Sequence, residues 1–190
     1  MEPTMKPKLV LHICCAPDEA WVVHSLSGTR ELHCFFSNSN IQPEAEYRTR
    51  LDEARRVAAH YGVAFSAAPY APAAWEDAVR DHLHTPEGGS RCAECFRLRL
   101  EETARFTRSI GWPSFTTVMS ISPHKNVRVL TAEGVRAARE SGVSYEPFDF
   151  KKKDGFLGSI RLSRELKLYR QDYCGCRLSL AERMTRAKPR

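Results

Sequence analysis

Near its N-terminus the sequence reads Leu9-Val10-Leu11-His12-Ile13-Cys14-Cys15-Ala16-Pro17-Asp18. Residues 9–13 form a short apolar run, of the kind found in strands that are buried on both faces of a parallel sheet. Two cysteines follow at once, and the apolar run 20–23 then indicates a helix. The segment therefore predicts a β-strand that passes directly into a helix, the unit from which α/β folds are built.

The same alternation continues along the chain. We expect further strands at 32–36, 63–67, 115–119 and 143–148, and further helices at 43–61, 93–110, 127–141 and 162–171. Strands that alternate with helices form right-handed crossovers and a parallel sheet with helices on both faces. The sequence therefore predicts a Rossmann-like α/β fold of the HUP type, as a single domain over residues 1–190. We expect a helical segment from about residue 157 to carry the last two cysteines.

Composition restricts the class of protein. The chain has 190 residues, of which 42% are hydrophobic and 27% charged, as in ordinary globular domains. No apolar run approaches the roughly 20 residues that a membrane helix needs, and no secretory signal is recognisable. We therefore expect a cytoplasmic protein without a membrane partner. The net charge of +6 permits an anionic partner such as tRNA.

The cysteines carry the strongest chemical signal. Six of the seven fall in three close groups, namely Cys14 with Cys15, Cys92 with Cys95, and Cys174 with Cys176. Thiols in the cytoplasm stay reduced, so metal binding or redox chemistry is favoured over disulfides. Cys34 stands alone in an apolar run. We expect it to pack as a small hydrophobic residue and not to bind metal.

Three kinds of chemistry fit these groups. Thiolates hold iron–sulfur clusters, and six cysteines exceed the four that one cubane needs. A Cys-x-x-Cys pair joined to a Cys-x-Cys pair also fits structural zinc, which leaves Cys14 and Cys15 unexplained. Dithiol redox chemistry at Cys92 and Cys95 is the third alternative. We favour the iron–sulfur interpretation over zinc, and both over thiol redox or simple packing.

Asp18 has two interpretations. It lies three residues after Cys15, so a turn could present its carboxylate to the same site as the cysteines. The two thiolates that a cubane does not need could then hold a second metal with Asp18. Taken alone, however, a carboxylate just before a predicted helix is more often its N-cap.

Several motifs combine these residues in a characteristic order. They are His12-Ile13-Cys14-Cys15-Ala16-Pro17-Asp18, Glu46-Tyr47-x-x-Arg50, Cys92-x-x-Cys95-Phe96-x-x-Arg99-Leu100, Ser122-Pro123-His124-Lys125 and Tyr169-Arg170-Gln171-x-Tyr173-Cys174-Gly175-Cys176. In this order, the chain resembles the QueH family of epoxyqueuosine reductases over residues 9–179. Residues 36–40 depart from a Tyr-Asn-Pro-Asn segment that is common in the family, without loss of an expected ligand.

The resemblance implies an enzyme that works without cobalamin. It would reduce the epoxide of epoxyqueuosine at the wobble position of tRNA and so form queuosine. It also implies a [4Fe-4S] cluster with an additional mononuclear iron, and it favours a ligand role for Asp18 over a cap. The implied ligands are Cys14, Cys15, Asp18, Cys92, Cys95, Cys174 and Cys176, as one set that the sequence does not divide between cluster and iron.

The implied reaction sets further expectations. Epoxide reduction takes up two electrons and two protons, so we expect a proton donor and an external electron donor. His124 and Tyr173 are the candidate proton donors, besides a catalytic role for Asp18. Candidate contacts to tRNA are Tyr47, Arg91, Lys125, Lys151, Lys152 and Lys153. Core packing for Tyr47, and a solvated surface for the charged residues, are the alternatives.

Two other functions compete with this one. A Rossmann-like tRNA-modifying ATP pyrophosphatase would need a glycine-rich phosphate loop after the first strand, where this chain has Cys-Cys-Ala-Pro-Asp-Glu instead. A zinc-stabilised RNA-binding module without catalysis is the other alternative. Metal analysis separates it from an iron–sulfur enzyme.

Overall fold

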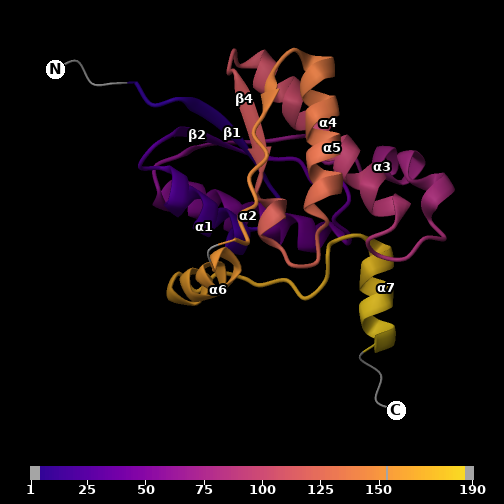
Figure 1. Ribbon diagram of the computed structural model, residues 1–190. Coiled ribbons are helices and arrows are strands. Elements are labelled where there is room, and N and C mark those ends of the chain that lie inside the picture. The colour runs from indigo at the N-terminus through magenta and orange to yellow at the C-terminus, as the bar shows by residue number, and fades with distance from the viewer. Residues whose placement is uncertain (1–4, 153, 187–190) are drawn as a thin grey trace.

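The computed structural model describes residues 5–152 and 154–186, and these form one parallel sheet of five strands with helices around it (Figure 1). The strands are β1 (Lys8–Ile13), β2 (Glu31–Phe36), β3 (Ala64–Ala67), β4 (Ser114–Thr117) and β5 (Ser144–Tyr145). Their order across the sheet is β3-β2-β1-β4-β5, so β1 is central and the chain crosses over it between β3 and β4. This is the order of a doubly wound α/β fold, and it confirms the predicted Rossmann-like architecture.

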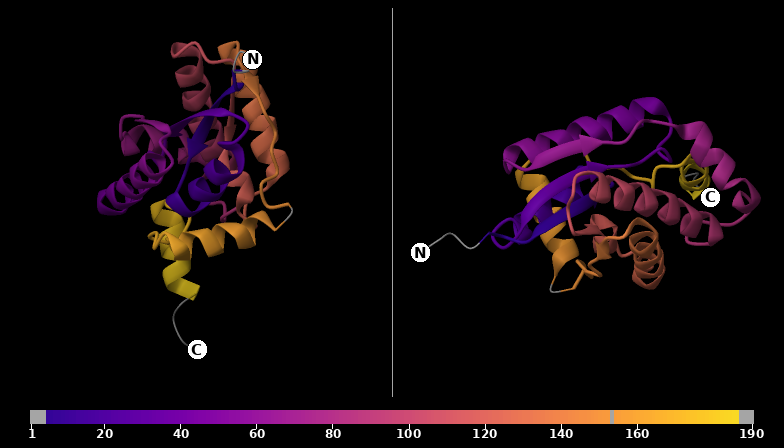
Figure 2. Two further views of the ribbon diagram at one scale, coloured as in Figure 1. Left: turned by 90° about the vertical axis from the view of Figure 1, so that its left-hand side faces the viewer. Right: turned by 90° about the horizontal axis from the view of Figure 1, so that it is seen from above.

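Helices follow most of the strands. They are α1 (Ala16–Leu26), α2 (Glu44–His60), α3 (Pro72–Ala78), α4 (Ser90–Ser109), α5 (Val127–Ser141), α6 (Gly155–Glu165) and α7 (Arg177–Arg186), with the short 3₁₀ helices η1 (Arg80–His82) and η2 (Val118–Ile121). Figure 2 shows α2 on one side of the sheet and α4 and α5 on the other, while α7 extends away from the sheet. None of the helices in the described part of the chain is long and apolar enough to cross a membrane.

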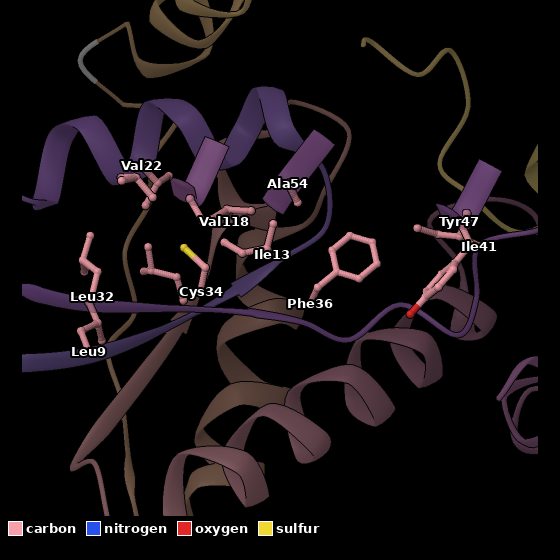
Figure 3. Close-up of a cluster of buried hydrophobic side chains, with 13 residues drawn as sticks. Leu9, Ile13, Val22, Leu32, Cys34, Phe36, Ile41, Tyr47, Ala54 and Val118 are labelled. Carbon is pink, nitrogen blue, oxygen red and sulfur yellow. The ribbon is translucent and has the colours of Figure 1, made fainter. Parts of the chain in front are cut away.

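Alternating residues of β1 build the two halves of the core. Leu9 and Ile13 point to one face, where they pack with Val22 of α1 and Ala54 of α2 (Figure 3). Val10 packs on the other face with buried residues of α4 and α5. Because successive side chains of a strand point to opposite faces, a continuous apolar run is what a strand covered on both sides requires. The interpretation of residues 9–13 is therefore confirmed.

The start of α1 differs from expectation and changes the role of Asp18. The helix begins at Ala16, with Pro17 in its first turn and Cys15 as the N-cap residue. Asp18 therefore lies inside the first turn and does not cap the helix. Pro17 explains the early start, because proline is favoured in the first turn and its fixed φ suits a helix.

The later elements were predicted less well. Strand 115–119 ends at Thr117, where the Thr117 hydroxyl accepts a hydrogen bond from the Met119 amide and the chain enters η2. The strand expected over 143–148 has only two paired residues. No helix spans 162–171, because α6 ends at Glu165 and Lys167 adopts a left-handed conformation with φ 51°. Leu168 is thereby turned into a small core cluster with Ala16 and Ala20.

The last two cysteines also differ from expectation. They were expected within a helical segment, but Cys174 and Cys176 lie in the irregular stretch between α6 and α7. Helices α3 and η1 were not predicted at all. The segment of α3 reads Pro-Ala-Ala-Trp-Glu-Asp-Ala, which is too short for a clear apolar period.

Helices α1 and α6 pack closely where Gly158 meets the ring of Trp21. A Cβ atom at Gly158 would lie 2.4 Å from the ring of Trp21, so Gly158→Ala must push α6 away from α1. We expect a net loss of roughly 1–3 kcal/mol in the free energy of unfolding, measured by urea denaturation. Gly28→Ala is the matched control, because a Cβ there meets nothing within 4 Å. Equal midpoints for the two variants would contradict the close packing.

Candidate metal centre

A pocket of about 570 Å³ opens at the edge of the sheet where the parallel strands end. Its walls include Cys14 just after β1, Asn38 just after β2 and Lys125 beyond β4. The stretch before α7 closes another side with Tyr173 and Cys174. Ligands of doubly wound sheets bind at this edge, near the point where the strand order reverses. The pocket is therefore the candidate site.

Three candidate ligands gather at the start of α1. The ligand atoms of Cys14, Cys15 and Asp18 all lie within 4.8 Å of one another, and no other such set of three occurs in the described residues. The Cys14 Sγ lies 3.8 Å from the Cys15 Sγ and 3.7 Å from the Asp18 Oδ2. Because α1 begins directly after Cys15, its first turn brings Asp18 back beside the cysteines. These residues form the first ligand group.

Burial and neighbouring charges determine the protonation of this group. Burial raises the pKa of Asp18 to about 6, against hydrogen bonds from Cys15 and Cys14 and the positive charges of Arg170 and Lys125. The pKa of the Cys15 thiol is raised, first by its hydrogen bond with Cys14 and then by burial. A bound cation would reverse these effects, because it stabilises the deprotonated ligands.

A second ligand group joins two segments that are distant in sequence. Cys92 and Cys95 are buried in the first two turns of α4. Burial raises the pKa of Cys92, and it raises that of Cys95 to about 11; the nearby Cys174 adds to both increases. Cys176 packs with Cys95 in one buried cluster. Cys92, Cys95, Cys174 and Cys176 therefore lie near one another, between α4 and the stretch before α7.

Arg50 holds the stretch that carries Cys174 and Cys176. Its guanidinium is buried and donates to the carbonyl oxygens of Tyr173, at 3.2 Å, and Cys174, at 3.0 Å. Gly175 allows the close approach, since it has φ 141° and a Cβ there would lie 3.1 Å from Asn40 and Ile41. Arg50 was quoted in a sequence motif, but its structural role was not foreseen.

Lys125 lies between the two ligand groups and not on the surface. Its Nζ is 2.8 Å from the Cys174 Sγ and 3.4 Å from Glu87 Oε1. Burial lowers the pKa of Lys125, but the charges of Cys174 and Glu87 outweigh burial and keep the pKa above its ordinary value. The side chain is only 12% exposed and is directed at a thiol, which disfavours the expected contact with a tRNA phosphate.

The two candidate proton donors differ in their surroundings. His124 is exposed and lines the pocket. Tyr173 also lines the pocket, but its hydroxyl donates to the carbonyl oxygen of Gln42 at 2.6 Å, and its ring lies against Arg50. The Tyr173 proton is therefore already engaged within the protein, whereas His124 is open to the pocket.

Two other candidate tRNA contacts, Tyr47 and Arg91, have buried side chains. Tyr47 is 6% exposed and lies in the hydrophobic core (Figure 3). Its ring stacks on that of Tyr70, so no face of the ring is free for a base. Arg91 is buried, pairs with Glu182 of α7 and donates to the carbonyl oxygen of Thr85. Both side chains serve packing between elements. Their neighbours in space, which supply these partners, are distant in sequence.

The lysine run is only partly described. Lys151 donates to the carbonyl oxygen of Lys125 at 3.3 Å, so it is tied to the loop behind the pocket. Lys152 is 77% exposed, and Lys153 lies outside the described residues. Nothing in these surroundings contradicts a contact of Lys152 with RNA.

A buried polar network beneath the pocket was not predicted as a unit. His12 is fully buried in this network. Burial lowers its pKa, so the neutral ring donates from Nε2 to the Ser37 carbonyl oxygen and accepts at Nδ1 from Thr117. Arg99 donates to the same carbonyl and to the Asn38 side chain. The only sequence signal was Arg99, a charged residue between Phe96 and Leu100 of a predicted helix.

The donor set fits a metal cofactor. Six thiols and one carboxylate from three segments line or adjoin one pocket, and soft sulfur ligands suit iron, zinc and iron–sulfur clusters. Cys34 lies apart from both groups, fully buried in the core.

Solved structures with a similar fold support the Rossmann-like architecture. The chain is similar to a predicted subunit of a tRNA methyltransferase from Methanocaldococcus jannaschii, with a TM-score of 0.58 and 12% identity over 81% of this chain and 74% of the other. It is also similar to the U34-tRNA thiolase NcsA from Methanococcus maripaludis, described with its [4Fe-4S] cluster. In that case the TM-score is 0.55, with 14% identity over 95% of this chain and 64% of the other. At such low identity the likeness concerns the fold.

Comparison of sequences is more specific. The family model for epoxyqueuosine reductase QueH matches residues 9–182. The epoxyqueuosine reductase QueH of Thermotoga maritima is 36% identical over 178 residues, which cover 92% of this chain and 91% of the relative. That of Streptococcus pyogenes serotype M1 is 34% identical over 179 residues, covering 91% and 70%. Since the match includes all seven candidate ligands and nearly all of the described fold, the chain belongs to the QueH family of epoxyqueuosine reductases and is an oxidoreductase.

Proposed function

We propose that the chain reduces the epoxide of epoxyqueuosine in tRNA to the alkene of queuosine, at a centre that holds a [4Fe-4S] cluster and one further iron. The observation that carries this proposal is that two separate ligand groups border one pocket, with Cys14 from the first and Cys174 from the second. The family match favours this activity over the pyrophosphatase and the zinc module.

The geometry supports a division of the ligands. We assign the first group, Cys14, Cys15 and Asp18, to the single iron, because the ligand atoms of one ion must lie close together. The second group supplies the four thiolates that a cubane requires. Its members are Cys92, Cys95, Cys174 and Cys176. The [4Fe-4S] cluster described for the NcsA structure supports the view that this fold can carry one.

The overall reaction breaks both C–O bonds of the epoxide, forms a C=C bond and releases water, with uptake of two electrons and two protons. When bound, the cofactor supplies single electrons and a Lewis-acid position for oxygen. An external donor provides the electrons. We assign proton delivery to His124, because it lines the pocket and remains open to solvent, and a loop-holding role to Tyr173.

Binding of tRNA is supported by the charge around the pocket. Arg170, Arg183 and Arg186 line it and are exposed, and Phe156 adds an aromatic ring. Arg183 pairs with Asp172, and Arg186 lies 3.9 Å from Glu182, so each can exchange a carboxylate for a phosphate. Loops of RNA are bound through splayed bases and phosphate contacts of this kind. A modified base must leave its stack to enter the pocket.

The direct test is anaerobic purification with iron and sulfide counts, followed by an assay on tRNA that contains epoxyqueuosine. With a chemical reductant, queuosine should appear in digests of the tRNA analysed by mass spectrometry. An iron-loaded protein that leaves epoxyqueuosine unchanged under these conditions refutes the proposed activity.

The cluster assignment predicts different results for two sets of cysteines. The double variant Cys174→Ala, Cys176→Ala should lose most iron, sulfide and visible absorbance together, because half of the cluster ligands are gone. Cys34→Ala is the control, since this buried residue lies outside both groups. It should keep the metal content and lose about 1 kcal/mol of stability. A double variant with a full complement of sulfide would exclude the assignment.

Asp18→Asn tests the single iron. The amide preserves the shape of the side chain but is a neutral and poorer ligand, and the structure excludes a capping role. We expect the sulfide content and colour to persist, while about one iron and the turnover of epoxyqueuosine tRNA are lost. Full iron together with full turnover would show that the carboxylate is not a ligand.

Arginines at the pocket should determine the salt dependence of tRNA binding. Binding to phosphates releases counterions, with a slope of about 0.7 for each contact on a single strand. The double variant Arg183→Ala, Arg186→Ala should therefore reduce the slope of log K against log salt by about 1.4. The control pair Arg105→Ala, Arg108→Ala lies at the far end of α4 from Cys92 and should leave it unchanged. Equal slopes for both pairs would remove α7 from the interface.

A further inference from the structure

Three of the four sulfur atoms of the second ligand group accept a hydrogen bond from an N–H donor of the protein. The backbone amide of Gly88 donates to the Cys92 Sγ at 3.2 Å, and that of Ser179 to the Cys176 Sγ at 3.4 Å. The ammonium group of Lys125 donates to the Cys174 Sγ at 2.8 Å. In the first ligand group, by contrast, the Cys14 Sγ interacts with Cys15 and Asp18.

The indole of Trp75 lies beside the fourth sulfur atom, that of Cys95. The Trp75 side chain is 3% exposed and packs directly against Cys95 and Cys176. Its Nε1 is buried without a hydrogen-bond partner, and an unpaired buried N–H is costly. The acceptor available to it at this site is the Cys95 Sγ, which lies in the same buried cluster.

We propose that Trp75 and Lys125 raise the reduction potential of the cluster by donating N–H···S hydrogen bonds to Cys95 and Cys174. This inference rests on the proposed assignment of the cluster to the second ligand group. Reduction adds one electron, supplied by an external donor, and the added negative charge is shared with the thiolates. Donors that face those thiolates therefore stabilise the reduced form more than the oxidised form.

Trp75 is a positioning residue and not a catalytic one. It does not line the pocket, whereas Lys125 does, so Trp75 can be changed without altering the walls that meet the substrate. The short helix α3 carries it against α4, and Val79 at the end of α3 belongs to the same buried cluster. The role of α3 is then to place one indole N–H on one cluster ligand.

Trp75→Phe in the iron-loaded protein tests the inference. Phenylalanine keeps an aromatic ring but has no N–H. We expect full iron and sulfide, with a fall of about tenfold in the ratio of reduced to oxidised cluster at a fixed potential, which equals about 59 mV for one electron. Resonance Raman bands of the Fe–S bonds to cysteine should shift as well. Trp112→Phe is the matched control, because this indole lies beside Lys8 at the opposite edge of the sheet.

The outcomes separate this inference from the proposed function. A Trp75→Phe protein with a complete cluster, an unchanged potential and unchanged Raman bands overturns the inference and leaves the reductase intact. If the Trp75→Phe protein loses its cluster, the reduction potential of the cluster is measured in the Lys125→Met protein instead. A potential below that of the wild type supports the inference, and the wild-type potential overturns it. A wild-type protein that contains no iron and no inorganic sulfide after anaerobic purification overturns both proposals.

Discussion

The candidate site depends on one buried charge, the guanidinium of Arg50. It pairs with Glu46 on the preceding turn of α2 and donates to the carbonyl oxygens of Tyr173 and Cys174. A buried guanidinium is strongly unfavourable without its acceptors, so the stretch that provides those carbonyls is held at the edge of the sheet. Cys174 and Cys176 reach Cys92 and Cys95 for this reason, and the second ligand group follows from a contact outside it.

Gathering so many potential anions has an electrostatic cost, which the fold reduces in two ways. Cys15 caps α1 and Cys92 lies in the first turn of α4, so both groups use the positive end of a helix. Lys125 adds a full positive charge between them. The remaining cost appears in the pKa values of Asp18, Cys92 and Cys95, which burial raises. A bound metal cation takes the place of the protons on these buried side chains and neutralises their negative charge, so the buried site favours metal binding.

Sequence patterns predicted elements well where one periodicity was long and unbroken. The helix at 127–141 was placed correctly, with Asn126 as its cap and Gly142 in the left-handed conformation at its end. Over 162–171 the pattern wrongly predicted a continuous helix. Leu166 and Leu168 both pack into one small cluster, although they lie beyond the end of α6 at Glu165. Two apolar residues near a helix end do not distinguish a further turn from a bend that buries the same side chains.

The sequence by itself determined the fold class, the family resemblance and the kinds of ligand, since these depend on local periodicity and on residue types in order. The tertiary structure decided which candidate ligands lie together, with Asp18 beside Cys14 and Cys15 while Cys174 and Cys176 lie beside α4. It also decided that Tyr47 and Arg91 serve packing, that Lys125 faces a thiol and that Trp75 reaches Cys95. The physical reason is that burial, charge and hydrogen bonding depend on distances between segments, and such distances exist only once the sheet has assembled.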